Sequence, residues 1–161
     1  MRNLFLPDIA TEQTLPLTII AVGERENEAY VKRDGEYLGH HLMFTKEGRG
    51  ILEIRDKKYT IEPNTIFLIE KGQPHQYYPV DKDWHTCWVI FNCASDYDIL
   101  NNLKLRNLSP QKIQKDIFVT FHNLIYNIAE SGGVSSIFKA SSQLYHLLSS
   151  LSYEIHYNGT N

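Results

Sequence analysis

The sequence has 161 residues, of which 42% are hydrophobic and 22% charged, and its formal net charge is −3. This length suits one domain with its own core, and the composition is that of a globular protein rather than a disordered chain. A slight excess of acidic residues excludes the basic surface that nucleic-acid binding requires. Any contact with DNA is therefore expected to come from residues outside this sequence.

The cysteines and the N-terminal residues indicate a cytoplasmic protein. Cys87 and Cys93 are the only cysteines. On one extended strand their Cα atoms would be about 20 Å apart, too far for a disulfide. The sequence also has no apolar run with the length of a signal peptide core or a membrane span. We expect reduced thiols, a cytoplasmic location and no contact with a membrane.

The chain divides into an expected arm at 1–15, a strand-rich region at 16–95 and a helical region at 96–161. The arm has no sustained periodicity, but it holds apolar residues that could dock over another surface. These are Leu4, Phe5, Leu6 and Ile9. The middle region has short β-branched or alternating runs between turn residues, which favours a sandwich or small barrel. Its expected strands are 17–22, 28–33, 38–45, 49–54, 58–62, 65–69 and 84–91, with a hairpin turn at 55–57.

The helical region shows the periodicity of two amphipathic helices. Ser109 and Pro110 are typical of an N-cap and a first helical residue, and the Ser-Gly-Gly run at 131–133 indicates a break. Both helices carry apolar residues on more than one face, so they pack either on the strands alone or also on a second copy of the chain. We expect a homodimer whose interface includes Leu144, Leu148, Leu151 and Ile155.

A long pattern of motifs runs from Arg33 to Phe91. In chain order it consists of Arg33, Gly48-Arg49-Gly50, Tyr59-x-Ile61-x-Pro63, Ile66 to Ile69, Gly72-x-Pro74-His75-x-Tyr77 and Asp83-Trp84-x-x-x-Trp88-Val89-x-Phe91. With the helical pair that follows, this pattern resembles the effector-binding and dimerisation domain of AraC-family transcription regulators. One departure is Pro63-Asn64-Thr65, where the family commonly has Pro-Gly-Asp. Because Asn tolerates a left-handed backbone, we expect the turn to survive.

The resemblance implies a mainly β fold with C-terminal helices: a cupin-like β-barrel of the jelly-roll type followed by a helical hairpin for dimerisation. In the family, a double helix-turn-helix region that binds DNA follows these helices. No segment of this sequence has that basic character. The chain therefore looks like the regulatory half of a longer regulator, which touches DNA only through a C-terminal domain absent from this sequence.

The same resemblance implies a set of pocket residues. The family places the equivalent of Trp88 in the effector pocket, together with the equivalents of Arg33, His75 and Tyr77. Because side chains alternate along a strand, the pocket is also expected to hold residues that share a face with these. They are Thr86 beside Trp88, Val31 beside Arg33, and His41 with Met43, while Ile90 is a further candidate and Tyr78 points outward.

These side chains suit a small polar ligand. The guanidinium of Arg33 presents a planar fork of donors for paired hydroxyls or a carboxylate. His75 and Tyr77 can donate or accept, and Trp88 offers a flat apolar face to a sugar ring. We therefore expect an effector, most simply a carbohydrate, held without a cofactor. The competing interpretations are that Trp88 belongs to the core and that Arg33 pairs with a structural carboxylate.

A metal centre is not expected. Cupin metal sites need three or four converging ligands, and His75 after Gly72 supplies only one. His40 and His41 are adjacent on a strand, so they point to opposite faces, and Glu47 lies at the strand end. We predict no catalytic residues and no metal ligands. The alternatives are a metal-dependent cupin enzyme, such as an isomerase or oxygenase acting on a small sugar or acid, and an interaction domain without a ligand.

Overall fold

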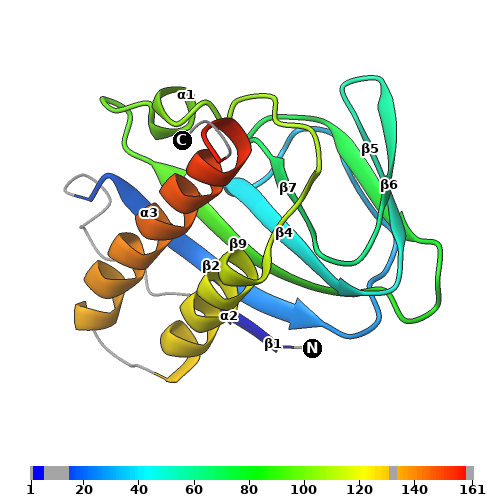
Figure 1. Cartoon of the computed structure of the whole chain (residues 1–161), viewed down its shortest axis with the longest axis horizontal. Helices are drawn as coiled ribbons and strands as arrows, with labels where there is room; N and C mark the ends of the chain where they lie inside the picture. Colours follow the sequence, from blue (N-terminus) through cyan, green and yellow to red (C-terminus); the bar gives the residue numbers. More distant parts are fainter. Residues whose placement is uncertain (1, 6–14, 131–133, 159–161) are drawn as a thin grey trace.

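Two β-sheets face each other in the computed structural model, and two helices cover the outer face of the larger sheet (Figure 1). The structure describes residues 2–5, 15–130 and 134–158. The strands are β1 (Arg2–Phe5), β2 (Leu17–Arg25), β3 (Val31–Arg33), β4 (His40–Glu47), β5 (Gly50–Ile54), β6 (Lys57–Ile61), β7 (Thr65–Ile69), β8 (His75–Pro79), β9 (His85–Cys93) and β10 (Gln111–Lys112). The helices are α1 (Ile99–Asn102), α2 (Lys115–Glu130) and α3 (Val134–His156).

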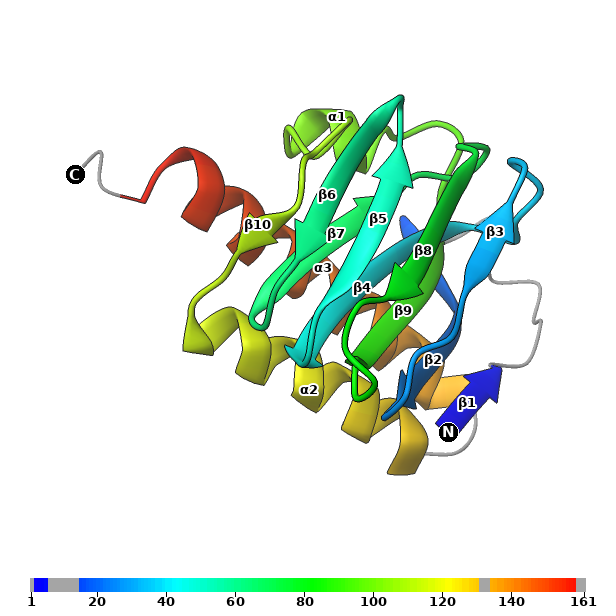
Figure 2. The same ribbon diagram turned by 90° about the vertical axis from the view of Figure 1, so that its right-hand side faces the viewer.

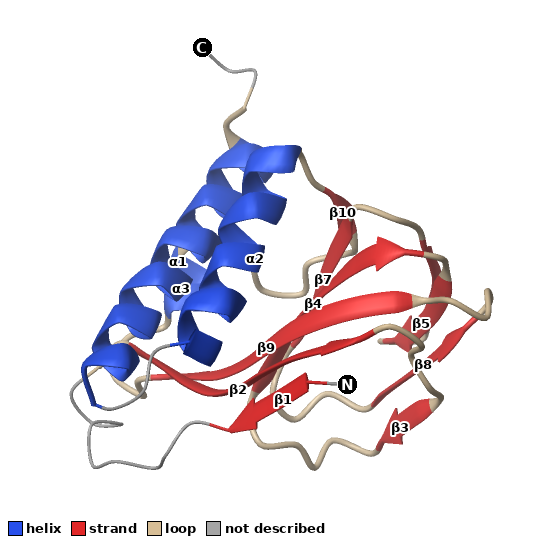
Figure 3. Ribbon diagram, turned by 90° about the horizontal axis from the view of Figure 1, so that it is seen from below, coloured by secondary structure: helices blue, strands red, loops and turns tan. Residues whose placement is uncertain are grey.

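The larger sheet has the strand order β1-β2-β9-β4-β7-β10, and the smaller sheet has the order β3-β8-β5-β6. In Figure 2 the smaller sheet lies in front, with the helices behind the larger sheet. Figure 3 shows the same layers from below, with α2 and α3 on one side of the larger sheet. The predicted fold, a mainly β cupin-like barrel followed by helices, is confirmed. No helix in the described ranges combines the length and apolarity of a membrane span.

The larger sheet is buried on both faces, because the helices cover one face and the smaller sheet covers the other. Toward the helices, Leu42 and Phe44 of β4 pack with Val89 of β9 in a core that includes Phe121 of α2. Toward the smaller sheet, Met43 of β4 joins a second core. The members of this second core are Met43, Leu52, Ile54, Ile61, Phe67, Ile69, Tyr77 and Trp84. Because successive side chains of a strand point to opposite faces, alternate residues pack against the helices and against the smaller sheet.

Two turns between strands are formed by residues that adopt a positive φ. Arg55 and Asp56 have φ values of 52° and 57° and join β5 to β6, with Ile54 opposite Lys57. A two-residue turn with both central residues left-handed suits the twist of the strands that it joins. The hairpin is therefore present with a turn one residue shorter than the sequence suggested. Asn64 has a φ of 62°, so the turn that commonly holds glycine in the family is retained.

The first long helix, α2, begins later than predicted. The expectation of a helix start at Ser109 and Pro110 is wrong, because Gln111 and Lys112 form β10 beside β7. Strand pairing satisfies the backbone here, and α2 begins only at Lys115. The predicted break at 131–133 lies outside the described residues.

The predicted arm begins as a strand. Its first part, β1, pairs with β2 in antiparallel register, with Leu4 opposite Val22 and Phe5 opposite Ala21. The sequence showed no period there because a four-residue strand is too short to display one. Leu6 and Ile9 lie outside the described residues.

The residues expected at a dimer interface lie inside the chain instead. Leu144, Leu148 and Leu151 are 0%, 0% and 1% exposed, in the core between α3 and the larger sheet. Ile155 is half-buried against the same core. Their predicted role is wrong for a physical reason: the apolar stripe of α3 is the face that covers the strands, and these leucines could reach a partner only by leaving the core. The prediction of a dimer itself is not decided by this placement.

Gly50 provides a test of how tightly the second core is packed. A Cβ atom added there would lie 2.5 Å from Cδ2, Cε2 and Cε3 of Trp84, which is fully buried and donates Nε1–H to Thr45 Oγ1 at 3.1 Å. We expect Gly50→Ala to lower the free energy of unfolding by about 1–3 kcal/mol. Urea denaturation measures this. The same substitution in a Trp84→Leu background should cost less, because the indole is gone. Equal costs in both backgrounds would contradict the contact.

Candidate ligand-binding site

A cavity of about 180 Å³ lies between the two sheets. Its walls come from β2, β4 and β9 of the larger sheet, from β3 and β8 of the smaller sheet, and from the loops after β2 and β3. The lining residues are Ala21, Arg25, Glu28, Val31, Arg33, Tyr37, His41, Tyr77, Trp88 and Ile90. Apolar walls with a few convergent polar groups are typical of small-molecule sites.

The strand register explains how the polar residues meet. In the smaller sheet, Arg33 of β3 lies opposite His75 of β8, and Val31 lies opposite Tyr77. In the larger sheet, His41 of β4 lies opposite Ile90 of β9. All these positions share the inward parity of their strands. Residues far apart in the sequence are therefore brought to one cavity by strand pairing.

Arg33 and His75 form a hydrogen-bonded pair. Arg33 Nη1 lies 3.2 Å from His75 Nε2, and His75 Nδ1 lies 2.9 Å from the carbonyl oxygen of Gln73. A carbonyl only accepts and a guanidinium only donates, so His75 is protonated at Nδ1 and accepts from Arg33 at Nε2. Burial, with the charge of Arg33, lowers the pKa of His75, while the Gln73 bond opposes this. The imidazole is thus neutral near pH 7.

Two tyrosines hold the guanidinium in place. The Cζ atom of Arg33 lies 3.8 Å from the ring centroid of Tyr37 and 5.9 Å from that of Tyr77. A cation over an aromatic face is stabilised by the ring quadrupole. Burial raises the pKa of Tyr77 to about 12 and raises the pKa of Tyr37. Both phenols are therefore protonated and can donate a hydrogen bond.

His41 is a buried polar side chain without a hydrogen-bond partner. It is 2% exposed, and neither Nδ1 nor Nε2 has a partner within the described structure. Its ring lies between those of Tyr37, Tyr77 and Trp88, with centroids 5.7, 6.3 and 6.3 Å away. Burial, and then the charge of Arg33, holds the pKa of His41 well below its ordinary value. A neutral imidazole therefore offers one donor and one acceptor to the cavity.

Glu28 is, in contrast, fully engaged. Its Oε1 accepts from Arg25 Nη1 at 3.0 Å and from the amide of Ala29 at 2.9 Å. Its Oε2 accepts from the hydroxyl of Thr86 at 2.6 Å. A buried carboxylate with these donors is balanced in charge and in hydrogen bonds. Arg25 and Glu28 therefore line the cavity as part of a self-contained polar cluster, with Thr86 behind Glu28.

The predicted pocket residues fall into distinct groups. The structure brings most of them to the cavity wall, namely Val31, Arg33, His41, Tyr77 and Trp88. His75 stands behind Arg33, Thr86 stands behind Glu28, and Met43 is buried in the second core. Their roles in binding stay a prediction. Ile90 also lines the cavity.

Sequence reasoning missed Ala21, Arg25, Glu28 and Tyr37. Glu28 and Tyr37 lie in loops, where no alternation predicts direction. On β2 the register shifts between Ile19 and Ala21, which removes the parity signal there. His40 does not line the cavity, and its Nδ1 accepts from the amide of Lys71 at 2.9 Å.

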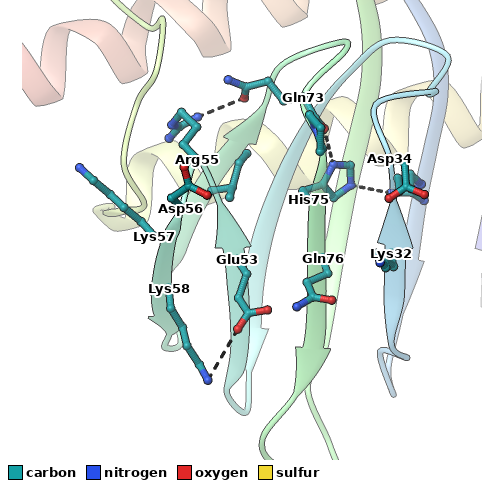
Figure 4. Close-up of a pocket in the computed structure, with 13 residues that line it drawn as sticks. Lys32, Asp34, Glu53, Arg55, Asp56, Lys57, Lys58, Gln73, His75 and Gln76 are labelled. Carbon is teal, nitrogen blue, oxygen red and sulfur yellow. Dashed lines mark hydrogen bonds and ion pairs between the residues drawn. The ribbon is translucent and has the colours of Figure 1, made fainter.

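A larger groove of about 620 Å³ lies outside the barrel, where β3, β5, β6 and β8 meet their turns (Figure 4). Several of its residues, such as Lys32, Glu53 and Gln76, have the parity that faces away from the cavity. Charged side chains dominate its walls, which is unlike an apolar small-molecule pocket. The inner cavity is therefore the better candidate site. Within the described ranges, no three His, Cys, Asp or Glu side chains gather as a metal site would require.

The buried His41 predicts a pH dependence of stability. Its pKa is lower in the folded than in the unfolded chain, so below about pH 6.5 the unfolded chain binds the extra proton. Stability is complete above that pH and is lost as the pH falls, by up to about 1.4 kcal/mol per unit. In urea denaturation between pH 7.5 and 5.5, His41→Gln should lose less stability than the wild type. His146→Gln serves as the control for removing an exposed histidine, and identical profiles for wild type and His41→Gln would contradict this account.

Known structures share this arrangement of sheets and helices. A variant of apo ToxT from Vibrio cholerae strain SCE256 aligns with a TM-score of 0.59 and 8% identity, over 89% of this chain and 58% of that chain. ToxT from Vibrio cholerae O395, bound to (E)-4-(8-methylnaphthalen-1-yl)but-3-enoic acid, aligns with a TM-score of 0.54 and 13% identity, over 84% of this chain and 55% of that chain. The chain thus spans just over half the length of these ToxT chains, and the likeness shows a common fold.

The sequence comparison is more specific about the family. No curated protein matches the sequence. Residues 20–148 match the family model of the AraC-like ligand binding domain. This match covers well over half of the chain and both layers that build the cavity. The chain therefore belongs to the family of AraC-like ligand binding domains.

Proposed function

We propose that this chain is the effector-sensing and dimerisation region of an AraC-type transcription regulator. It binds a small carbohydrate between its sheets and relays occupancy to a DNA-binding region outside this sequence. The observation that carries the proposal is His41, a buried neutral imidazole whose two nitrogens have no partner within the described structure. A buried polar group of this kind calls for an explanation, and a ligand in the cavity supplies one.

The chemistry around His41 favours hydroxyl groups. A hydroxyl can accept from the N–H of the imidazole and can also donate to its unprotonated nitrogen. A group that only accepts or only donates can make just one of these two bonds. Arg33, Tyr37 and Tyr77 add further donors on one side of the cavity. Trp88 faces the same space with a flat apolar surface, which suits the C–H groups of a sugar ring. The volume of about 180 Å³ favours a single small ring over a long chain.

A regulatory role is favoured over catalysis. A metal-dependent cupin needs three or more ligand side chains around one point, and the residues described here bring no such group together. The cavity's carboxylate, Glu28, is already saturated with donors and is poorly placed to act as a base. An interaction domain without a ligand would fill the cavity with its own apolar side chains, whereas polar groups line it.

The N-terminal strand supports a route for the relay. β1 pairs with β2, and its register places Phe5 opposite Ala21, a residue of the cavity wall. A ligand that presses on β2 would alter the surface on which the arm is held. Coupling of this kind is typically about 1–3 kcal/mol and is reciprocal, so DNA binding by the intact regulator would change ligand affinity by the same factor.

An exposed apolar face on the helices supports the proposed homodimer. On α3, Phe138 and Tyr145 are exposed one above the other at a spacing of seven residues, about two turns. On α2, Val119 and Tyr126 are exposed with the same spacing. None of these residues belongs to the buried stripe that covers the larger sheet. A second copy of the chain could cover this face, in place of the interface first expected on the leucines.

Ligand binding can be tested on matched variants of one strand. Tyr77 and Tyr78 are neighbours on β8, but Tyr77 lines the cavity and Tyr78 points outward to Glu53. In calorimetric titration with a panel of monosaccharides, Trp88→Ala should weaken binding by about tenfold, since an aromatic contact is worth up to about 1.5 kcal/mol. Tyr77→Phe should also weaken binding, and Tyr78→Phe should not. A sugar that binds wild type and Trp88→Ala equally well would exclude this cavity.

The helical interface can be tested by mass in solution. We expect Tyr145→Glu to convert a dimer into a monomer in analytical ultracentrifugation, because a carboxylate would be buried without a partner. Val80→Glu, at an equally exposed valine in the turn after β8, should leave the dimer intact. A dimer that survives Tyr145→Glu and Phe138→Glu would place the interface elsewhere. A monomeric wild type would refute the dimer.

A further inference from the structure

The cavity has an uncompensated positive charge. Its ionised groups are the guanidinium groups of Arg25 and Arg33 and the carboxylate of Glu28. Arg25 and Glu28 form an ion pair at 3.0 Å and balance each other. Arg33 has no ion-pair partner within the described part of the chain: it contacts His75, Tyr37 and Tyr77.

The contacts of Arg33 are all neutral. His75 accepts from Nη1 as an uncharged imidazole, and both phenols are protonated. A guanidinium carries five N–H donors, and the bond to His75 uses only one of them. Arg33 is partly buried, so its charge is partly withdrawn from water and would gain from an anionic partner. A negatively charged group would therefore be stabilised beside Arg33.

We infer that the ligand is anionic, and that it is a small hydroxylated carboxylate of the acidic-sugar class. Its carboxylate would accept from the free donors of Arg33, and a ring hydroxyl would both donate to and accept from His41. The inference rests on the proposed function and narrows it from carbohydrates in general to those that carry an acid group. A guanidinium and a carboxylate match in a planar, two-point arrangement that a neutral hydroxyl cannot reproduce.

The outer groove gives independent support. Arg33 lines both the cavity and the groove, so the two are adjacent. More basic than acidic side chains line the groove (Figure 4). The basic ones are Lys32, Arg33, Arg55, Lys57 and Lys58, and the acidic ones are Asp34, Glu53 and Asp56. On a chain with a net charge of −3, a basic groove next to the cavity would raise the local concentration of an anion.

The basic groups of the groove are not all committed elsewhere. Lys58 is paired with Glu53 at 3.7 Å, and Arg55 donates to Gln73 and to the carbonyl of Leu108. Lys32 and Lys57 are exposed and make no ion pair within the described residues. Asp34 and Asp56 of the groove also make no ion pair within the described residues and offset these two lysines. The surplus positive charge that would attract a carboxylate is therefore that of Arg33 and Arg55.

The test compares sugars that differ only in the acid group. The purified chain is titrated calorimetrically with D-galacturonate against D-galactose, and with D-glucuronate against D-glucose. At least one acid should bind more tightly than its neutral counterpart by about ten- to hundredfold, the range for a hydrogen bond to a charged group. Raising the salt concentration should weaken the acid more than the neutral sugar.

Variants of Arg33 separate charge from shape. Arg33→Gln should abolish the preference for the acid while thermal unfolding confirms that the variant is folded. Arg33→Lys should keep part of the preference, because it keeps the charge but not the planar fork. Tyr78→Phe is the control outside the cavity and should bind as the wild type does.

The outcomes distinguish this inference from the proposed function. If sugars bind but neither acid binds more tightly than its neutral counterpart, the inference is overturned and carbohydrate sensing stands. If the acid is preferred but Arg33→Gln keeps the full preference, the assignment to Arg33 is overturned. If none of the four sugars binds at millimolar concentration, both the inference and the carbohydrate proposal fail.

Discussion

The burial of the larger sheet on both faces is the constraint on which the rest of the structure depends. On β9, Cys87, Val89 and Phe91 pack toward the helices, whereas Trp88 and Ile90 face the cavity. A shift of one residue in register would exchange these two sets. The helices on one side thus fix which residues of β9 can meet a ligand on the other. The alternation of side chains along β9 therefore determines both which residues pack against the helices and which residues line the cavity.

The polar groups in the cavity divide into a satisfied set and an unsatisfied set. Glu28 has a donor for each oxygen, including a buried hydroxyl from Thr86, so it belongs to the framework. His41 has no hydrogen-bond partner in the described structure, and Arg33 has only neutral ones. Buried networks in stable proteins are normally complete, since each missing bond costs free energy. The incomplete side of the cavity is therefore the side that a ligand would complete.

The sequence located residues of this cavity only where they lie on regular strands, because the alternation of side chains predicts their direction only there. Parity and family resemblance placed Arg33, Tyr77 and Trp88 in the lining of one cavity, where the structure also has them. Parity fails in loops and across bulges, so Tyr37 and the residues of β2 were missed. Side-chain periodicity also does not show which neighbouring element covers an apolar stripe. The spacing of the residues around Leu144 predicted the buried face of a helix, but it did not predict that the larger sheet covers this face. Helix signals at Ser109 were overridden by strand pairing at β7.

The position of β2 bears on how binding could be transmitted. β2 pairs with β1 at one edge and β9 at the other, and α3 packs against it. It also supplies Ala21 and Arg25 to the cavity. A ligand changes a regulator only if it binds one of two arrangements better than the other. β1 is joined to the barrel through a single neighbouring strand at the sheet edge, so its release would cost less than any change in β9 or β4. In the proposed regulator, the arm is therefore the element whose placement a modest ligand energy could shift.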